Sequence, residues 1–189
     1  MRAWFHRVRH TLEVALLPLA GRPLRYLEIG VCVGYSLAWV LENVLTHPDS
    51  RAVGVDIWKP QGPRRSKLHA VSSCWYEEAV ARLEPWKDKV ELIKADSKAY
   101  LPTLPAESFD IVYIDGDHQY DAVMSDSREA LRLVSPGGVI GWDDCHLGAN
   151  RNAQRIRAVP EAFADFMEEY GQHVRIVFKT PRQRWAVKK

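Results

Sequence analysis

Four carboxylates and one imidazole stand close together in the sequence, directly after two short apolar runs. They are Asp115, Asp117, His118, Asp143 and Asp144. Carboxylate oxygens are the ligands that Mg²⁺ and similar cations prefer, and an imidazole can accept a proton near neutral pH. Carboxylates gathered at one place repel one another unless a positive charge lies between them. The group therefore predicts a site for a divalent cation.

Two buried strands joined by a helix would bring these side chains together. The runs Phe109–Ile114 and Val139–Trp142 are apolar, as in strands that are covered on both faces. Apolar residues between Val123 and Val134 recur near helical spacing, and the breakers Ser135–Gly138 are expected to end that helix. A strand–helix–strand unit has parallel strands, so both acidic ends lie at the sheet edge where open α/β sheets bind ligands.

Helix capping is the simpler interpretation of part of this group. Asp117 fits an N-cap, and Asp121 fits the first turn of a helix. Capping does not explain Asp115, which directly ends one strand, or the pair Asp143 and Asp144, which ends another. We therefore favour a functional site over capping.

The composition is that of an ordinary globular domain. The 189 residues, 47% of them hydrophobic, suit a single domain over 1–189, with an amphipathic helix expected within 1–20. A net charge of +2 is too small to indicate a nucleic-acid partner. Neither a signal peptide nor a membrane-length apolar run is visible, so we expect no membrane partner. Three scattered cysteines fit a cytoplasmic setting.

A second pattern, nearer the N-terminus, is typical of nucleoside-cofactor binding. The predicted strand Leu24–Ile29 leads into a tight turn bounded by Gly30 and Gly34, and such glycines let the backbone approach a ligand. The next predicted strand, Ala52–Asp56, ends in an acid 22 residues beyond Gly34. A carboxylate in this position can hold the ribose hydroxyls of a cofactor.

Further residues extend this predicted cofactor site. The strand Val90–Ile93 precedes Asp96 and Ser97, which lie where an adenine could bind, and Trp58 could cover the base or the ribose. The breaker-rich segment 58–73 is either a solvated loop or a substrate-facing one. No G-x-G-x-x-G fingerprint or P-loop is present, which disfavours a dinucleotide cofactor and nucleoside triphosphate hydrolysis.

The remaining elements complete an alternation of strands and helices. We expect helices over Tyr35–Leu45, Ser72–Trp86 and Val159–Tyr170, and strands over Val174–Phe178 and Trp185–Val187. The last two strands are expected to form an antiparallel hairpin at the edge of the sheet.

With these residues in view, the chain resembles the class I S-adenosylmethionine-dependent methyltransferases. More narrowly, it is similar to the metal-dependent small-molecule O-methyltransferases of the catechol, caffeoyl-CoA and macrolide-sugar types. Leu27–Ser36, with the sequence LEIGVCVGYS, resembles the first cofactor motif of that family, and Asp56 resembles its ribose-binding acid. The resemblance implies an α/β fold with a Rossmann-like, doubly wound, seven-stranded sheet of order 3-2-1-4-5-7-6, in which strand 7 is antiparallel.

The same resemblance implies roles for individual residues. S-adenosylmethionine would lie against Glu28, Gly30, Gly34, Ser36, Asp56, Trp58, Asp96, Ser97 and Asp115. A divalent cation, Mg²⁺ in the first instance, would be held by Asp115, Asp143 and Asp144. His118 follows Asp115 by three residues, where catechol-type relatives carry a lysine base and sugar-type relatives a histidine. This difference points away from catechols and towards a sugar or another vicinal diol as the acceptor.

The predicted function is metal-assisted O-methylation of a small molecule, with His118 as the general base. Three alternatives remain open. A metal-independent methyltransferase would use the acids as hydrogen-bonding groups, and a non-catalytic protein would only bind S-adenosylmethionine. An NAD-dependent oxidoreductase is disfavoured by the missing glycine fingerprint. A homodimer is compatible with the sequence.

Overall fold

The structure, a computed structural model, describes residues 5–59, 72, 74–146 and 159–189. Its strands are β1 (Arg25–Ile29), β2 (Arg51–Asp56), β3 (Val90–Lys94), β4 (Phe109–Ile114), β5 (Val134–Trp142), β6 (Val174–Lys179) and β7 (Arg184–Lys188). Its α-helices are α1 (Phe5–Leu16), α2 (Tyr35–Asn43), α4 (Trp75–Leu83), α5 (Ser97–Tyr100), α6 (Tyr120–Leu133) and α7 (Val159–Tyr170). Short 3-10 helices are η1 (Leu17–Leu19), η2 (Glu84–Trp86), η3 (Leu101–Thr103) and η4 (Gly171–His173).

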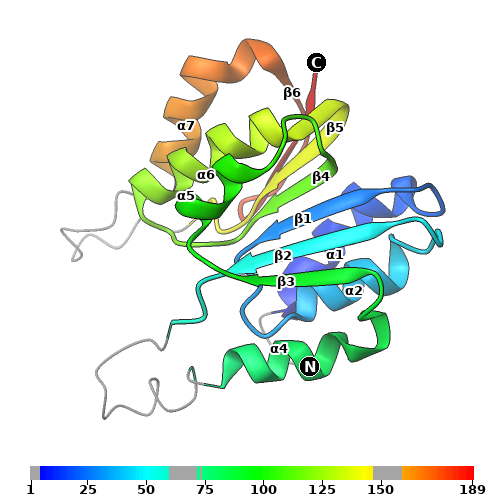
Figure 1. Cartoon of the computed structure of the whole chain (residues 1–189). Helices are drawn as coiled ribbons and strands as arrows, with labels where there is room; N and C mark the ends of the chain where they lie inside the picture. The colour runs from blue at the N-terminus through cyan, green and yellow to red at the C-terminus, as the bar shows by residue number, and fades with distance from the viewer. Residues whose placement is uncertain (1–4, 60–71, 73, 147–158) are drawn as a thin grey trace.

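The strands form one mixed sheet with the order β3-β2-β1-β4-β5-β7-β6. Strands β1 to β5 run parallel to one another, whereas β7 lies antiparallel between β5 and β6. Figure 1 shows α1, α2 and α4 on one face of the sheet and α5, α6 and α7 on the other. The predicted seven-stranded, doubly wound order with an antiparallel strand 7 is confirmed.

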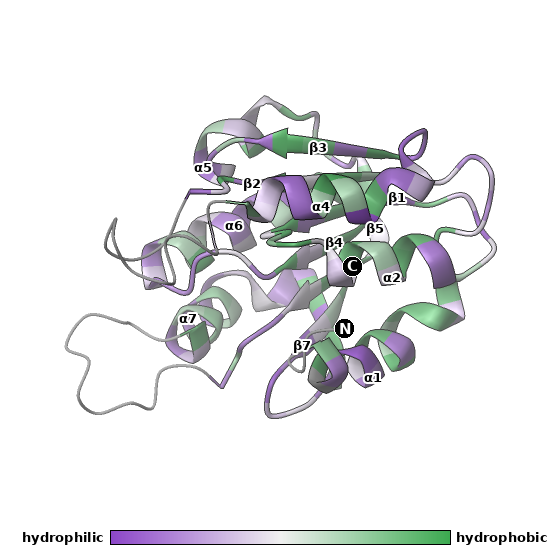
Figure 2. Ribbon diagram, turned by 90° about the horizontal axis from the view of Figure 1, so that it is seen from below, coloured by the Kyte–Doolittle hydropathy of each residue, from purple (hydrophilic) through white to green (hydrophobic). Residues whose placement is uncertain are grey.

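Hydrophobic side chains form one cluster on each face of the sheet. Because successive side chains of a strand point to opposite faces, Tyr26 belongs to the first cluster and Leu27 to the second. Helix α1 buries four hydrophobic residues at helical spacing: Phe5, Val8, Leu12 and Leu16. In Figure 2 the strands are largely apolar, whereas α1 and α6 carry both hydrophilic and hydrophobic residues. The helices therefore cover the sheet with their apolar sides.

The breaker-rich segment Ser135–Gly138 follows the end of α6 at Leu133, but it belongs to β5 and does not precede that strand. Strands β4 and β5 are paired on both sides of this segment, but their register shifts between Phe109 and Ile111. The extra residues form a bulge, and Gly137 adopts a φ of 78°, which favours glycine. The expectation that this strand begins at Val139 was therefore wrong.

Two predicted helices are shorter in the structure. Helix α2 ends at Asn43 rather than Leu45, and α4 begins at Trp75 and gives way to a 3-10 helix at Glu84. Most of the predicted loop over 58–73 lies outside the described residues. Within the described ranges, no helix combines the length and the apolar character needed to cross a membrane.

Candidate active site

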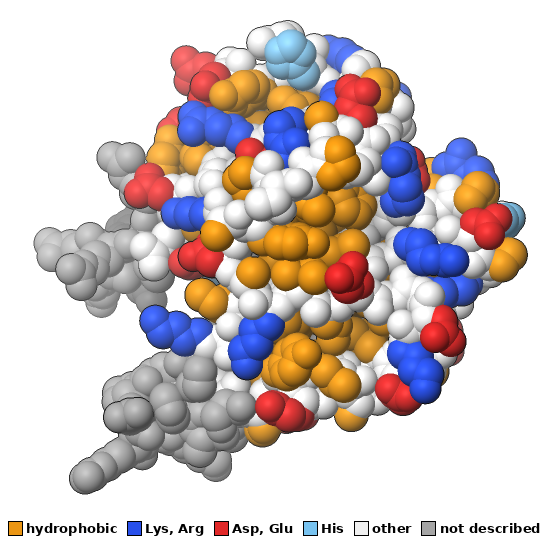
Figure 3. Space-filling model, in the orientation of Figure 1, with side chains coloured by type: hydrophobic (Ala, Val, Ile, Leu, Met, Phe, Trp, Pro, Cys, Tyr) orange, Lys and Arg blue, Asp and Glu red, His pale blue; other side chains and the backbone are white. Residues whose placement is uncertain are grey.

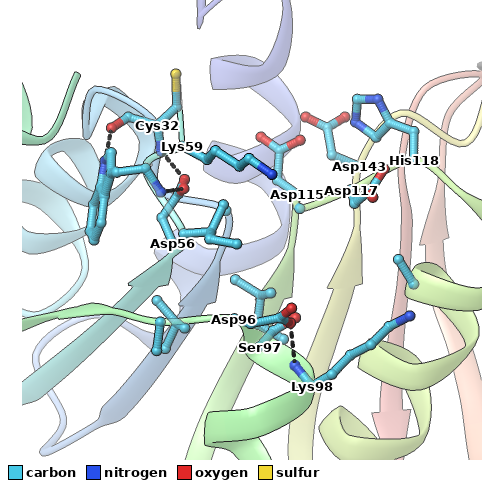
Figure 4. A pocket seen from close by; sticks show the side chains of 18 of the residues that line it. Cys32, Asp56, Lys59, Asp96, Ser97, Lys98, Asp115, Asp117, His118 and Asp143 are labelled. Atoms are coloured by element: carbon cyan, nitrogen blue, oxygen red, sulfur yellow. Dashed lines mark hydrogen bonds between the residues drawn. The ribbon is translucent and has the colours of Figure 1, made fainter. Parts of the chain in front are cut away.

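A pocket of about 740 Å³ lies at the carboxyl ends of β1 to β5 (Figure 4). Nine of the twelve predicted site residues line it: Gly30, Asp56, Trp58, Asp96, Ser97, Asp115, His118, Asp143 and Asp144. Residues far apart in the sequence meet here because the parallel strands all end at this edge of the sheet. The predicted cofactor residues and the predicted metal residues therefore share one pocket.

The turn after β1 passes very close to the end of β4. Gly30 adopts a φ of 94°, and a Cβ atom at this position would lie 2.1 Å from the carbonyl oxygen of Asp115. No side chain fits there without a shift of the backbone. The Gly30 nitrogen donates to the carbonyl oxygen of Val55, and the Asp115 nitrogen donates to that of Ile29, both at 2.8 Å. These bonds bring the ends of β1, β2 and β4 together at the pocket.

Asp56 ties the glycine turn to the chain after β2. Its Oδ2 accepts a hydrogen bond from the backbone nitrogen of Cys32 at 2.8 Å, and its Oδ1 accepts one from that of Trp58 at 2.7 Å. The indole nitrogen of Trp58 donates to the carbonyl oxygen of Cys32 at 2.6 Å. The Trp58 ring packs edge-on against Tyr76 with centroids 4.9 Å apart. Asp56 and Trp58 are thus fixed in position on the pocket wall before any ligand binds.

Glu28, Gly34 and Ser36 lie behind the pocket wall rather than on it. The Glu28 carboxylate is fully buried and accepts hydrogen bonds from Tyr26 Oη at 2.7 Å and Ser36 Oγ at 2.6 Å. Burial raises the pKa of Glu28 to about 7, although these two hydrogen bonds oppose the shift. The hydrogen bond from Ser36 to Glu28 ties the first turn of α2 to β1, directly after Gly34, which ends the glycine turn.

Asp96 and Ser97 line the pocket at the start of α5. The Asp96 carboxylate caps this helix by accepting a hydrogen bond from the Lys98 nitrogen at 3.0 Å. Ser97 Oγ donates to Asp126 Oδ1 at 2.8 Å. Burial raises the pKa of Asp126 to about 6, and the Ser97 hydrogen bond opposes the rise. Asp126 is a functional candidate that the sequence pattern did not reveal, because it lies within a helix among other polar residues.

Asp115, His118 and Asp144 form a compact group at the ends of β4 and β5. Each offers one ligand atom, and these atoms lie within 4.8 Å of one another. Burial raises the pKa of Asp115 well above its ordinary value, and the charges of Asp143 and Asp144 raise it further. Carboxylates that close together are poorly stable as anions unless a cation accompanies them.

The ring nitrogen Nε2 of His118 is buried and has no hydrogen-bond partner within the described part of the chain. It lies 3.2 Å from Asp144 Oδ2, which is an ion-pair distance without the direction of a hydrogen bond. The nitrogen is therefore placed to accept the proton of a bound hydroxyl. The two carboxylates beside it, Asp115 and Asp144, are donors of the kind that Mg²⁺ prefers, so the residues present fit the metal that the resemblance implies.

Both carboxylate oxygens of Asp143 accept hydrogen bonds from the protein. Its Oδ2 accepts a hydrogen bond from Tyr113 Oη at 2.9 Å, and its Oδ1 accepts one from the Asp144 backbone nitrogen at 2.7 Å. The sequence predicts Asp143 as a metal ligand together with Asp115 and Asp144. In the structure His118 lies with Asp115 and Asp144 in one group, and Asp143 lines the same pocket.

Arg182 contacts Asp143 and Asp144 from the turn between β6 and β7. No motif of the sequence predicts it as a site residue. Its Nε donates to Asp143 Oδ1 at 3.3 Å, and its Nη2 donates to Asp144 Oδ1. The register explains this position, because Trp142 pairs with Arg184 and the antiparallel continuation sets Arg182 opposite Asp144. The sequence shows both strands but not their register, so this contact could not be predicted.

A comparison with known protein families shows which family the chain belongs to. Residues 27–145 match a family model described as a methyltransferase domain. The chain belongs to this methyltransferase family. The expected resemblance to class I methyltransferases is thereby confirmed, together with the strand order.

Individual relatives of this methyltransferase agree with the family match. An O-methyltransferase of Aspergillus thermomutatus is 31% identical over 170 residues, which are 88% of this chain and 63% of that protein. A catechol O-methyltransferase of Mycobacterium tuberculosis is 27% identical over 160 residues, 85% of this chain and 66% of that one. The chain thus spans 60% to 66% of the length of the curated relatives that it matches.

A solved structure with bound cofactor has the same fold. The O-methyltransferase TomG from Streptomyces achromogenes, in complex with SAM, superposes with a TM-score of 0.69 at 24% identity. The match covers 100% of this chain and 81% of TomG.

We divide the methyltransferase pocket into two halves. In Figure 4, Asp56 lies on one side of the pocket and Asp115, Asp143 and His118 lie on the other. We call the first the cofactor half, consisting of Gly30, Asp56, Trp58, Asp96 and Ser97. We call the second the acidic half, consisting of Asp115, His118, Asp143, Asp144 and Arg182. A cofactor in the first half would present its reactive methyl group to an acceptor in the second.

Proposed function

We propose that this methyltransferase transfers a methyl group from S-adenosylmethionine to a hydroxyl oxygen of a small molecule, with assistance from a divalent cation. The observation that supports the proposal best is the single pocket in which a fixed acid at the end of β2, Asp56, faces the group of Asp115, His118 and Asp144. Asp56 is suited to bind a ribose, and the group of three is suited to an acceptor with adjacent oxygens.

The cofactor half would bind the nucleoside of S-adenosylmethionine. Asp56 is fixed by two backbone N–H groups, and its remaining lone pairs are available to the ribose hydroxyls. Asp96 and Ser97 lie on the adenine side of this arrangement, and Trp58 closes the wall beside them. We infer that Glu28, Gly34 and Ser36 act indirectly by holding the glycine turn in place.

The acidic half would activate the acceptor. Methyl transfer is an in-line displacement in which an acceptor oxygen bonds to the methyl carbon while the bond from that carbon to sulfur breaks. His118 Nε2 would take the hydroxyl proton, because it is buried and without a hydrogen-bond partner in the described chain. A divalent cation held by Asp115 and Asp144 would lower the pKa of the acceptor hydroxyl. Asp143 would orient Asp144 through its hydrogen bond to the Asp144 nitrogen.

We infer a sugar or another vicinal diol as the acceptor class. A histidine at position 118, where sugar-type relatives carry one, supports a sugar. The name of the relative called catechol O-methyltransferase supports adjacent hydroxyls as the general feature of the acceptor. Figure 3 shows basic and acidic side chains interspersed over the face of the molecule that it displays, which supports a small-molecule partner rather than nucleic acid. A single domain over 1–189, a cytoplasmic location and a homodimer stay predictions.

Two measurements test this function. Calorimetry is expected to show S-adenosylhomocysteine binding, and Asp56→Ala is expected to weaken it by about 1–3 kcal/mol, because buried ribose hydroxyls lose their acceptor. Asp49→Ala is the matched control, since the Asp49 side chain is 78% exposed and lies outside the pocket. Mass spectrometry on a panel of diols is then expected to show methyl transfer that stops with EDTA. A protein that binds NAD in preference to S-adenosylhomocysteine would contradict the proposal.

A metal-independent methyltransferase is the second candidate, and Arg182 is the observation that favours it. Its guanidinium already supplies a positive charge to Asp143 and Asp144. Methyl transfer that continues in excess EDTA would select this candidate and would leave the cofactor assignment intact.

A further inference from the structure

Arg182 brings a permanent positive charge into the acidic half. Its side chain is 26% exposed, while those of Asp143 and Asp144 are 2% and 11% exposed, so the ion pairs are largely removed from water. An arginine keeps its charge at every physiological pH. The acids are therefore partly neutralised by the chain itself.

The turn that carries Arg182 is anchored on both sides. Thr180 Oγ1 accepts hydrogen bonds from the backbone nitrogens of Arg182 at 3.2 Å and Gln183 at 2.9 Å. The Cys145 nitrogen donates to the Arg182 carbonyl oxygen at 2.7 Å, which fixes the turn to the residue after Asp144. Hydrogen bonds thus hold the backbone of the turn at the residue that carries the guanidinium.

A buried chain of hydrogen bonds holds the neighbouring acid. Gln183 is fully buried and donates from Nε2 to Tyr113 Oη at 2.8 Å, and this hydroxyl donates to Asp143 Oδ2 at 2.9 Å. Trp185 Nε1 donates to Gln183 Oε1 at 3.1 Å and completes the chain. The β6–β7 turn therefore fixes the acidic pair through two adjacent residues.

We propose that Arg182 is a built-in counter-cation that shares Asp144 with the divalent cation and lowers the affinity of the site for it. This inference rests on the proposed function. Arg182 binds Oδ1 of Asp144, which leaves Oδ2, the oxygen that faces His118. A divalent cation on Oδ2 would lie on the same carboxylate as the guanidinium, and one on Oδ1 would have to displace it. Repulsion between the two cations opposes metal binding in both cases.

Binding of Mn²⁺ alone tests the inference without reference to turnover. Free Mn²⁺ is measured by electron paramagnetic resonance with the full chain, its Arg182→Gln variant and its Arg182→Lys variant. We expect Arg182→Gln to bind Mn²⁺ at least about tenfold more tightly, because a positive charge is removed beside the site. Arg182→Lys keeps the charge and is expected to stay close to the parent. Arg128→Gln, which removes a half-exposed arginine paired with Glu169 outside the pocket, is the control.

S-adenosylhomocysteine binding, measured in parallel, shows that each variant is folded. If Arg182→Gln loses it, Arg182→Met, which keeps most of the aliphatic stem, takes its place. Unchanged or weaker Mn²⁺ binding in the neutral variant, or no Mn²⁺ binding in any variant, overturns the inference. Methyl transfer by the parent is measured separately. Absence of methyl transfer would contradict the proposed function without affecting the Mn²⁺ result, and unchanged Mn²⁺ binding would contradict this inference without affecting the proposed function.

Discussion

The two halves of the pocket hold negative charge in different ways. In the cofactor half, Asp56 accepts hydrogen bonds from two backbone N–H groups, one of them in the glycine turn. In the acidic half, Asp115 lies among other carboxylates, and burial followed by the charges of Asp143 and Asp144 raises its pKa. Backbone donors hold Asp56 in place, whereas clustered carboxylates repel one another unless a positive charge or a proton accompanies them. Arg182 supplies part of that positive charge to Asp143 and Asp144.

The difference follows from where the partners lie in the sequence. Asp56 is fixed by Cys32 and Trp58, which belong to the chain just after β1 and β2. The acidic half joins the ends of β4 and β5 to a turn 38 residues beyond Asp144, where Arg182 lies. A contact of that kind depends on the register between β5 and β7.

The largest expected effect separates the acidic half from the cofactor half. Asp144→Ala is expected to abolish metal-dependent methyl transfer, because the site loses an oxygen ligand and a negative charge together. Binding of S-adenosylhomocysteine is expected to stay at the parental level, since Asp144 lies outside the cofactor half. Asp88→Ala, which removes an exposed acid away from the pocket, is the control. Calorimetry that shows a comparable loss of cofactor binding would mean that the two halves are not separate.

His118→Ala tests the acidic half more finely. The variant is expected to keep Mn²⁺ and cofactor binding within a small factor and to lose about 10²–10⁴ in rate, the usual contribution of a positioned general base. Its remaining rate is expected to rise with pH, because hydroxide then removes the acceptor proton. The solvent-exposed His10 provides the matched control, His10→Ala. Initial rates of methyl transfer by the parent and both variants are measured from pH 6 to pH 9. A His118→Ala variant as fast as the parent at neutral pH would exclude His118 as the base.

Glu28 links the halves, because the charges of both Asp56 and Asp143 raise its pKa after the larger effect of burial. Its folded-state pKa of about 7 lies above the ordinary value of 4.5. The folded chain therefore holds a proton that the unfolded chain releases, and stability is expected to fall as pH rises from about 4.5 to about 7. Glu28→Gln is expected to remove at most about 3 kcal/mol of this fall. Urea unfolding at pH 5 and pH 8 measures it, and an equal pH dependence in both proteins would refute the assignment.

Periodicity and strand-end acids were enough to predict most of the fold and most of the pocket wall. Runs such as Phe109–Ile114 are short, apolar and followed by acids, so both the strand and its functional end can be identified locally. The same alternation could have shown that Glu28 points away from Leu27, to the face where Tyr26 lies. Glu28 was instead assigned to the cofactor by motif, whereas its side chain is buried behind the wall.

What could not be predicted depends on packing between distant segments. Asp126 has the sequence context of a solvated helical acid and is buried only because α6 packs on α5 and the end of β4. Ser135–Gly138 contains residues that usually end elements, yet the sheet retains it as a bulge within β5. These outcomes are set by tertiary contacts, which a single sequence does not display.

The smallest expected effect concerns the adenine side of the cofactor half. Ser97→Ala removes the hydroxyl that donates to Asp126 at 2.8 Å, and it leaves that buried carboxylate without this donor. We expect S-adenosylhomocysteine to bind more weakly by about 0.5–1.5 kcal/mol, the net contribution of one hydrogen bond. The pKa of Asp126, about 6 in the parent, is expected to rise, because the Ser97 bond is the largest of the contributions that lower it.

The pH dependence of this variant distinguishes a direct contact from a structural one. If Ser97 touches the adenine, the affinity deficit of Ser97→Ala is expected to be similar at pH 5 and pH 8. If Ser97 acts only by stabilising ionised Asp126, the deficit is expected to grow between those pH values, because the carboxyl of the parent ionises at lower pH than that of the variant. Ser135→Ala, whose hydroxyl lies on the exposed side of β5 and bonds to the Glu107 carbonyl oxygen, controls for the loss of a serine hydroxyl elsewhere. A Ser97→Ala protein with parental affinity at both pH values would remove Ser97 from the cofactor half and leave Asp96 as the acid on the adenine side.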